Sequence, residues 1–125
     1  MNIIPTIRYR DSASAVKFLE TAFGFEPVVV NHHADGSVQH AELWYGDGVV
    51  LLSARSDPPG PFDTGTTVSY VVVDAVDAHH DRARAAGADI VMPLTDQPYG
   101  AREYAARDPE GNIWSFGTYR PRRTG

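Results

Sequence analysis

The chain contains no cysteine. This absence excludes disulfides, thiolate catalysis and cysteine-ligated zinc or iron–sulfur sites, so any metal ion would have to be held by histidines and carboxylates. The chain also lacks any apolar run near the ~18 residues that a membrane span needs. Residues 1–11 lack the basic start, long apolar stretch and cleavage site of a secretory signal. We therefore expect a cytoplasmic protein that does not act in a membrane.

Positive charge is scarce as well. The sequence has 11 Lys and Arg residues against 16 Asp and Glu residues, which gives a formal charge of -5 at pH 7. Because phosphate binding needs a basic face, nucleic acid is not expected as a partner, and a neutral or cationic partner is favoured. The Arg-rich segment Arg120–Arg123 is interpreted as a solvated tail.

Three common catalytic signatures are missing: the Gly-rich phosphate loop, the H-E-x-x-H zinc helix and the nucleophile elbow. No local arrangement of Ser and His residues singles out a catalytic triad. The chain of 125 residues is 42% apolar and 22% charged, which is typical of one globular domain. A domain of this size buries roughly two thirds of its unfolded surface. A core and one binding cleft are therefore expected.

An internal repeat predicts the architecture. The segment Ile7–Asp11 matches Tyr70–Asp74 at an offset of 63 residues, and each is followed by a helical stretch that ends at a glycine. The same offset aligns Gly48–Ser53 with Gly111–Phe116. The glycines that end the two helical stretches, Gly24 and Gly87, are also 63 residues apart, and three matches at one offset favour a true repeat. We predict an α+β fold made of two βαβββ modules.

The first module is assigned to about residues 1–57. Apolar residues from Ala15 to Phe23 recur at helical spacing, with Asp11 or Ser12 as the N-cap and Gly24 as the terminator. The expected strands are residues 3–9, 25–31, 38–45 and 49–54, with hairpin turns at 34–36 and 46–48.

The second module is assigned to about residues 62–119, after a stiff proline-rich linker at 58–61 and before a basic tail at 120–125. Asp108–Gly111 reads as a turn from its composition. The expected helix covers residues 75–86, and the expected strands are 66–73, 89–93, 102–107 and 112–119.

These features together resemble the vicinal oxygen chelate superfamily, which includes glyoxalase I, bleomycin and fosfomycin resistance proteins and extradiol dioxygenases. The likeness covers nearly the whole chain. It rests on the paired modules and on the stretches Ile7–Asp11, Phe18–Phe25, His40–Leu43, Tyr99–Glu103 and Asp108–Trp114. The resemblance implies a concave sheet face that carries the ligand and helices on the convex side. It also implies a homodimer, with the cleft either within one chain or across two.

In that superfamily, metal ligands come from the first and fourth strands of each module, where a metal is present. The matching positions here are Ile4, Leu52, Thr67 and Ser115. None offers a carboxylate or an imidazole, and two hydroxyls beside two aliphatic side chains would neutralise a dication poorly. We therefore expect no metal site and no cofactor.

Strand alternation selects the side chains expected in the cleft. His40, Glu42 and Trp44 alternate with an apolar set that would pack on the helix. By the repeat, Glu103 is the partner position of His40. Nine ligand-binding candidates follow: Arg8, His40, Glu42, Trp44, Thr67, Ser69, Tyr99, Glu103 and Ser115.

Each candidate also has a structural interpretation. His40 and Glu42 could serve as a general base pair with Glu103 as the acid, or form a structural hydrogen bond or dimer contact. Arg8 could bind a carboxylate or phosphonate, or neutralise Glu42. Tyr99 and Phe62 could close a pocket or cover an apolar edge.

Other features are assigned to structure. Trp114 and Phe116 are expected to face the helix as core residues. The doublet His32–His33 points to opposite faces of a strand, and His79–His80 lies in a helix with many charged residues, a pattern typical of a solvated surface. Neither doublet is expected to bind metal.

The leading hypothesis is a bleomycin-resistance-like protein that binds a small aromatic or cationic compound without a metal ion. The alternative is a superfamily lyase or isomerase that acts on a small oxygenated substrate with His40 and Glu42. A third interpretation is a domain that only associates with other proteins. Fold analogy does not choose among them, so the question of catalysis stays open.

Overall fold

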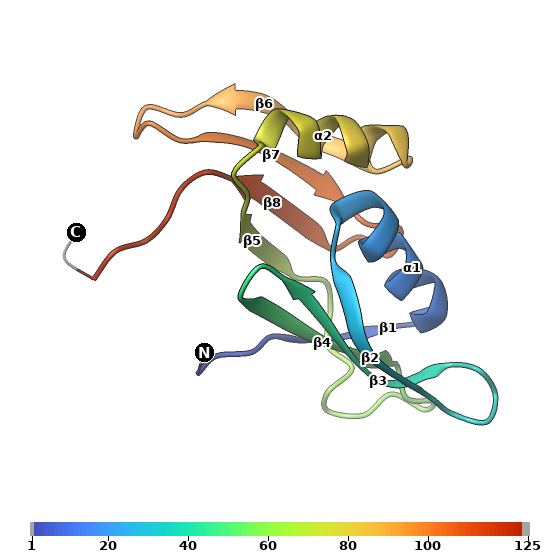
Figure 1. The fold of residues 1–125 in the computed structure, drawn as a ribbon. Helices are drawn as coiled ribbons and strands as arrows, with labels where there is room; N and C mark the ends of the chain where they lie inside the picture. The colour runs from blue at the N-terminus through green and yellow to red at the C-terminus, as the bar shows by residue number, and fades with distance from the viewer. Residues whose placement is uncertain (1, 124–125) are drawn as a thin grey trace. The chain divides into compact units, whose positions relative to one another are not determined.

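The computed structural model describes residues 2–123, in two compact units, Met1–Thr67 and Val68–Gly125. Each unit contains one helix and one four-stranded sheet, as the repeat predicted (Figure 1). The α+β fold of two βαβββ modules is therefore confirmed. None of the helices in the described chain is long and apolar enough to span a membrane.

The first unit has strand order β1-β4-β3-β2. The pairing of β1 with β4 is parallel, and the other two pairings are antiparallel. Its elements are β1 (Thr6–Tyr9), α1 (Ser12–Phe23), β2 (Glu26–His32), β3 (Val38–Tyr45) and β4 (Gly48–Ala54).

The second unit repeats this plan with strand order β5-β8-β7-β6, and β5 is parallel to β8. The β5 strand starts two residues later than expected and β6 extends three residues further. Its elements are β5 (Val68–Val72), α2 (Val76–Ala85), β6 (Asp89–Asp96), β7 (Arg102–Arg107) and β8 (Ile113–Gly117).

Helix α1 begins and ends where its sequence signals predicted. Asp11 is the N-cap, and its carboxylate accepts a hydrogen bond from the Ser14 amide at 3.2 Å. Gly24 ends the helix in the left-handed region, at φ 79°, which a residue without a Cβ adopts readily. Ser12 is buried instead of capping, and its hydroxyl accepts from the Val38 amide at 2.9 Å, which ties α1 to β3.

One face of each sheet packs against the helix of its own unit. In the first unit Ala41, Leu43 and Leu52 are almost fully buried on this face, opposite Leu19 and Phe23 of α1. In the second unit the face is aromatic: Tyr104, Trp114 and Phe116 are fully buried. The prediction that Trp114 and Phe116 are core residues is confirmed.

His79 departs from the sequence-based interpretation. It is only 8% exposed, and its Nδ1 lies 2.6 Å from the Tyr104 hydroxyl. The centroid of its ring lies 4.3 Å from that of Phe116, with the two rings tilted by 40°. The assignment of His79–His80 to a solvated surface was therefore wrong for His79. The neighbouring charged residues on α2 masked the fact that positions 76, 79 and 83 form one buried stripe.

The turn before β8 is organised by a buried carboxylate. Asp108 is 4% exposed, and its Oδ1 accepts from the amides of Glu110 and Asn112, both at 3.0 Å. Its Oδ2 accepts from the Trp114 indole nitrogen at 3.1 Å. Asp108 therefore connects the turn to the aromatic core, a structural role that agrees with the turn assigned from composition.

Replacing Asp108 is expected to destabilise the fold strongly. Asp108→Ala leaves several buried N–H groups without an acceptor, so we expect a loss of about 2–4 kcal/mol in the free energy of unfolding. Urea unfolding followed by circular dichroism measures it. Asp89→Ala is the matched control, because Asp89 is exposed and pairs only with Arg107, and it should lose less than about 1 kcal/mol. Equal losses in the two variants would contradict the assigned role.

Candidate functional site

The face of each sheet that points away from its helix is called the open face here. On the first sheet the parallel register pairs Arg8 with Ser53. On the second sheet it pairs Tyr70 with Ser115. Paired residues of a parallel sheet share a face, so each of these pairs lies on one face of its sheet. The two pairs occupy equivalent strands, which makes Tyr70 the structural counterpart of Arg8 and Ser115 that of Ser53. The structural offset on these strands is 62 residues, since 70 − 8 and 115 − 53 both equal 62.

This one-residue difference from the sequence repeat reverses two predicted positions. Leu52 pairs with Ala41 and is 1% exposed, so it faces α1 and not the open side. Ser69 pairs with Trp114, the largest buried side chain of the second unit, so the prediction that Ser69 faces the cleft was wrong. The reason is that side chains of a strand alternate between its two faces. An alignment that is wrong by one residue therefore assigns every side chain of the strand to the opposite face.

The open face of the second unit carries a carboxylate held by two tyrosines. Glu103 is 6% exposed. Tyr70 donates its hydroxyl to Glu103 Oε2 at 2.8 Å, and Tyr99 donates to Oε1 at 2.7 Å. The Tyr70 hydroxyl in turn accepts from the amide of Tyr119 at 3.1 Å. We name Tyr70, Tyr99 and Glu103 the tyrosine–glutamate cluster. Two of its members, Tyr99 and Glu103, were predicted from the sequence.

Gly117 makes room for this cluster. A Cβ at position 117 would overlap the Tyr70 hydroxyl and Glu103 Cγ. Gly117 and Glu103 are paired across β7 and β8, so the missing side chain leaves the space into which Tyr70 reaches. A glycine here allows close approach of neighbouring groups rather than a special backbone conformation.

The cluster holds its protons firmly. The pKa of Tyr70 is raised to about 12. Burial is the largest cause, and the hydrogen bond to Glu103 is the second largest. The pKa of Tyr99 is also raised, mainly by its hydrogen bond to Glu103 and to a smaller extent by burial. Both phenols therefore stay neutral donors at neutral pH.

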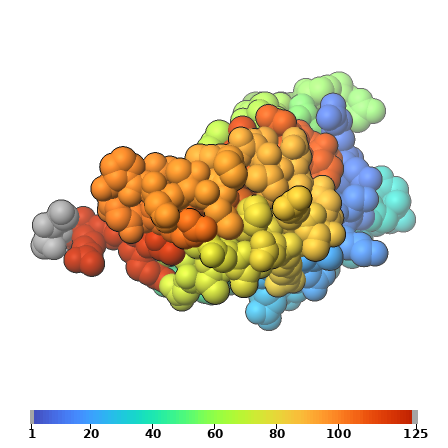
Figure 2. All heavy atoms as spheres, turned by 90° about the horizontal axis from the view of Figure 1, so that it is seen from above, coloured from blue at the N-terminus to red at the C-terminus, as the bar shows by residue number. Residues whose placement is uncertain are grey.

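A hollow of about 350 Å³ lies beside the cluster in the same unit. Its walls include Tyr99 and Tyr119, whose rings meet edge to face at 5.8 Å. In the space-filling view, the orange atoms around residue 99 lie next to the red atoms of the C-terminal segment (Figure 2). Arg120 and Arg122 also line the hollow, and Arg120 pairs with Asp74 at 3.0 Å.

In the first unit the structure brings together His40 and Glu42. Their Nε2 and Oε2 atoms are 3.5 Å apart, and both side chains are partly exposed. Trp44 lies on the same face of β3, and its indole nitrogen is buried and donates to no described residue. Arg8 does not neutralise Glu42: it pairs with Asp63 at 3.3 Å, and Phe62 lies over it at 5.7 Å.

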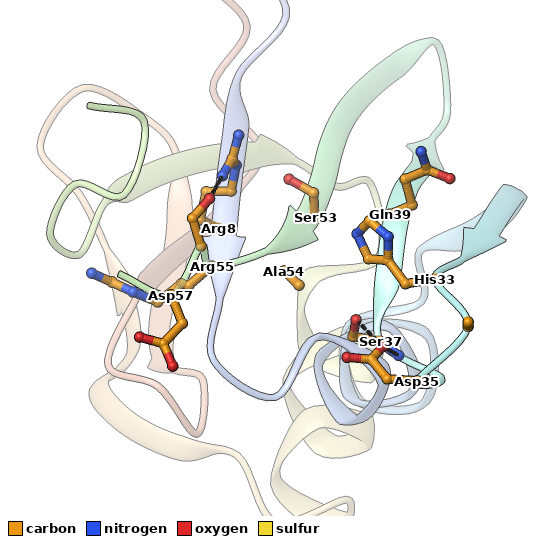
Figure 3. Close-up of a pocket in the computed structure, with 11 residues that line it drawn as sticks. Arg8, His33, Asp35, Ser37, Gln39, Ser53, Ala54, Arg55 and Asp57 are labelled. Atoms are coloured by element: carbon orange, nitrogen blue, oxygen red, sulfur yellow. Dashed lines mark hydrogen bonds between the residues drawn. The ribbon is translucent and has the colours of Figure 1, made fainter. Parts of the chain in front are cut away.

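A second hollow, of about 710 Å³, lies at one end of the first sheet and is called the arginine hollow here. In the view of Figure 3, Ser53 and Ala54 lie between Arg8 on one side and His33 and Gln39 on the other. Arg8 alone among its lining residues was a sequence candidate. The others lie near the start of β3, at the end of β4 and in the segment that follows it, and in the β2–β3 hairpin, where alternation gives no guide.

Two further predicted residues are not members of the tyrosine–glutamate cluster defined above. Thr67 precedes β5 and is half-buried. Ser115 lies on the open face between Tyr70 and Ala105.

The paired open-face positions on β4 and β8 carry hydroxyls rather than carboxylates or imidazoles. The candidate hydroxyls are Ser53, which is paired with the cationic Arg8, and Ser115, which neighbours Tyr70 and an alanine. A dication needs carboxylate or imidazole ligands. Among residues 2–123, no group of three or more His, Asp or Glu side chains is placed to hold a metal ion.

Comparison with known proteins supplies the family. The structure of TioX from Micromonospora sp. ML1 is similar, with 36% sequence identity, a TM-score of 0.81, and coverage of 96% of this chain and 99% of that chain. An uncharacterized protein of Mycobacterium bovis is 31% identical in an alignment of 121 residues that covers 90% of this chain and 80% of the relative. A lactoylglutathione lyase structure from Agrobacterium tumefaciens shares the fold at 22% identity and a TM-score of 0.69, covering 94% and 93%.

The family model described as "Glyoxalase/Bleomycin resistance protein/Dioxygenase superfamily" matches residues 4–116. That span includes every predicted ligand-binding position and both βαβββ modules apart from the last residue of β8. The sequence-based resemblance is thus confirmed, and the chain belongs to the glyoxalase/bleomycin resistance protein/dioxygenase superfamily.

Proposed function

We propose that the chain binds a small, positively charged aromatic compound without a metal ion, as a sequestering protein of the bleomycin-resistance type. The observation that carries this proposal is the Glu103 carboxylate. It is nearly buried, and both of its oxygens are held by neutral tyrosine hydroxyls. No Lys, Arg or His among residues 2–123 forms an ion pair with it.

A carboxylate in this state attracts a cation. Its charge is stabilised by hydrogen bonds but not cancelled, and partial burial reduces the screening by water. Because Tyr99 and Tyr70 have raised pKa values, they keep their protons and add no negative charge of their own. The negative potential therefore belongs to Glu103.

The aromatic walls favour the same class of ligand. Tyr99 and Tyr119 are both largely exposed, at 60% and 46%. Their faces can stack on a planar ring and attract a cation through the ring quadrupole. A phenol that donates to a carboxylate is richer in electrons, which strengthens this attraction. The 350 Å³ hollow falls within the usual size range of small-molecule sites, roughly 300–1,000 Å³.

The arginines at the rim determine how a cation approaches. The positive charge of Arg120 is balanced by its ion pair with Asp74, whereas Arg122 forms no ion pair with a described residue. We therefore expect the cationic end of the ligand to lie at Tyr99 and the planar, uncharged part to extend toward Tyr119. Metal independence, a cytoplasmic location and a homodimer remain part of this proposal on the strength of the family resemblance.

His40 and Glu42 support a second candidate, a lyase or isomerase acting on a small oxygenated substrate. The 3.5 Å separation allows a carboxylate to orient an imidazole that takes a proton. Both groups lie on an open face and can be reached from solvent. In this candidate His40 is the base and Glu42 its orienting partner.

The ligand class is tested by charge. Proflavine, a planar cation, should bind more tightly than neutral acridone. The Glu103→Gln variant should lower proflavine affinity about tenfold, roughly 1.4 kcal/mol, and leave acridone affinity unchanged. Isothermal titration calorimetry measures both. Glu26→Gln, an exposed carboxylate on β2, is the matched control and should bind like the unmodified protein. If the two dyes bind equally, or if Glu103→Gln has no effect, the proposal fails.

The proton state of the cluster is tested by alkaline titration. The pKa of Tyr70 is raised, so its hydrogen bond stabilises the fold fully below pH 10 and is lost as the pH rises from 10 toward about 12. The difference in phenolate absorbance between the unmodified protein and Tyr70→Phe should show one group that ionises near pH 12. Glu103→Gln should move that group toward 10. A difference curve centred at 10 in the unmodified protein would rule out the hydrogen-bonded cluster.

The second candidate is tested by turnover. A panel of small epoxides and α-hydroxy carbonyl compounds is incubated with the purified protein and product formation is followed by mass spectrometry. If the chain is an enzyme of this kind, His40→Ala should lower the rate by about 10²–10⁴ and Glu42→Gln by a similar factor. His32→Ala, an exposed histidine of β2, is the control and should retain the rate. Turnover that survives in both variants would remove the pair from the mechanism.

A further inference from the structure

The arginine hollow, of about 710 Å³, is not used by the proposed function. It lies wholly within the first unit, whereas the tyrosine–glutamate cluster lies within the second. We propose that it binds an aromatic carboxylate, through Arg8 and Arg55. The proposal rests on the unused hydrogen-bond donors of these two guanidinium groups.

Arg8 uses only one of its nitrogens. Its Nη1 donates to Ser56 Oγ and to Asp63 Oδ1, both at 3.3 Å, which is long for a charge-assisted bond. Its Nε is buried and donates to no described residue, and no contact of Nη2 is found in the described chain. The Nε–Nη2 edge is the side of the guanidinium that binds carboxylates in a fork. Because Nε is shielded, we expect a ligand to reach Nη2 first and Nε after a small rotation.

Asp63 does not depend on Arg8. Its carboxylate accepts from the amides of Gly60 at 2.7 Å and Ser56 at 3.0 Å. The hydrogen bond from the Gly60 amide is the largest cause of the lowered pKa of Asp63, and the hydrogen bond from the Ser56 amide is the next. The charge of Arg8 lowers this pKa less. Asp63 is therefore chiefly a link within its own loop. Arg8 keeps most of its capacity to bind a second carboxylate.

Arg55 forms no ion pair with a carboxylate among residues 2–123, although its charge, like that of Arg8, helps to lower the pKa of Asp63. It donates only to two backbone carbonyls, those of Asp63 and Thr64, at 3.3 and 3.2 Å. Its positive charge borders the hollow and is opposed only in part, by the nearby Asp63. The Ser53 hydroxyl, which also lines the hollow, forms no hydrogen bond with a described side chain, and it can donate one to a ligand.

Two acidic residues on the wall decide which anion fits. The Asp35 carboxylate already accepts two hydrogen bonds from Ser37 at its Oδ1 atom, one from the amide at 2.9 Å and one from the hydroxyl at 2.6 Å. Asp57 is exposed, and in the view of Figure 3 its carboxylate is directed away from Ser53. With these charges nearby, a dianion such as phosphate would be repelled more than a carboxylate, which carries a single charge. A carboxylate is therefore favoured.

Phe62 favours an aromatic rather than an aliphatic carboxylate. Its ring lies 5.7 Å from the centre of the Arg8 guanidinium and is 73% exposed. Stacking against one face of Arg8 leaves the edge of the guanidinium available. A ligand ring attached to a carboxylate at that edge would lie near the exposed phenylalanine. The hollow is large enough for such a ligand.

The test compares benzoate, acetate and inorganic phosphate by isothermal titration calorimetry at low ionic strength. Benzoate should bind with saturation and more tightly than acetate or phosphate. Arg8→Gln and Arg55→Gln should each weaken benzoate binding at least tenfold, and Phe62→Ala should weaken benzoate but not acetate. Arg84→Gln, an exposed arginine of α2, is the matched control and should change affinity by less than twofold.

Circular dichroism establishes that each variant is folded, and Arg55→Gln keeps the test decisive if Arg8→Gln fails to fold. The proposal is overturned if the folded protein shows no saturable benzoate binding. It is equally overturned if benzoate affinity survives in both arginine variants, or if phosphate binds more tightly than benzoate. Proflavine binding is expected to be unchanged in Arg55→Gln, so the outcome is separate from that of the proposed function.

Discussion

The alternation of side chains along each strand is the constraint on which both candidate sites depend. Each sheet packs one face against its own helix, and that face takes the large apolar and aromatic side chains, such as Leu43 in one unit and Trp114 in the other. The opposite face is then left to polar groups. Arg8 and Tyr70 occupy equivalent places on these open faces, each paired with a serine.

The two open faces differ in charge because the repeat has diverged at these paired positions. In the first unit the place is filled by a guanidinium, and the neighbouring loop supplies Asp63 and Phe62. In the second it is filled by a phenol that reaches over Gly117 to a buried glutamate. The same backbone plan therefore carries a guanidinium in one unit and a carboxylate held by two tyrosines in the other, and the two proposed sites take ligands of opposite charge for this reason. Fold alone could not have distinguished these two outcomes.

The fold could be predicted from the sequence because local signals agreed with the repeat. The cap at Asp11, the glycine at 24 and the strand β7 at Arg102–Arg107 all lie where the pattern placed them. The site was predicted less well. Glu103 and Tyr99 were among the predicted positions, but Tyr70 was not, because aligning the repeat one residue off placed Ser69 on the open face. His79 was misjudged since its charged neighbours hid a buried stripe of three positions. Hollows built from strand ends and hairpins, such as that lined by Ser53 and His33, leave no periodic signal.

The central claim is that the Glu103 carboxylate and its tyrosines form a site for an aromatic cation. The most direct measurement is the mapping of backbone amide chemical shifts as proflavine is added to the labelled protein. The account predicts that the largest changes fall at residues 99–103 and 117–119, which hold Tyr99, Glu103, Gly117 and Tyr119. Saturable binding whose largest changes lie outside these residues would contradict it, as would the absence of any change at high ligand concentration.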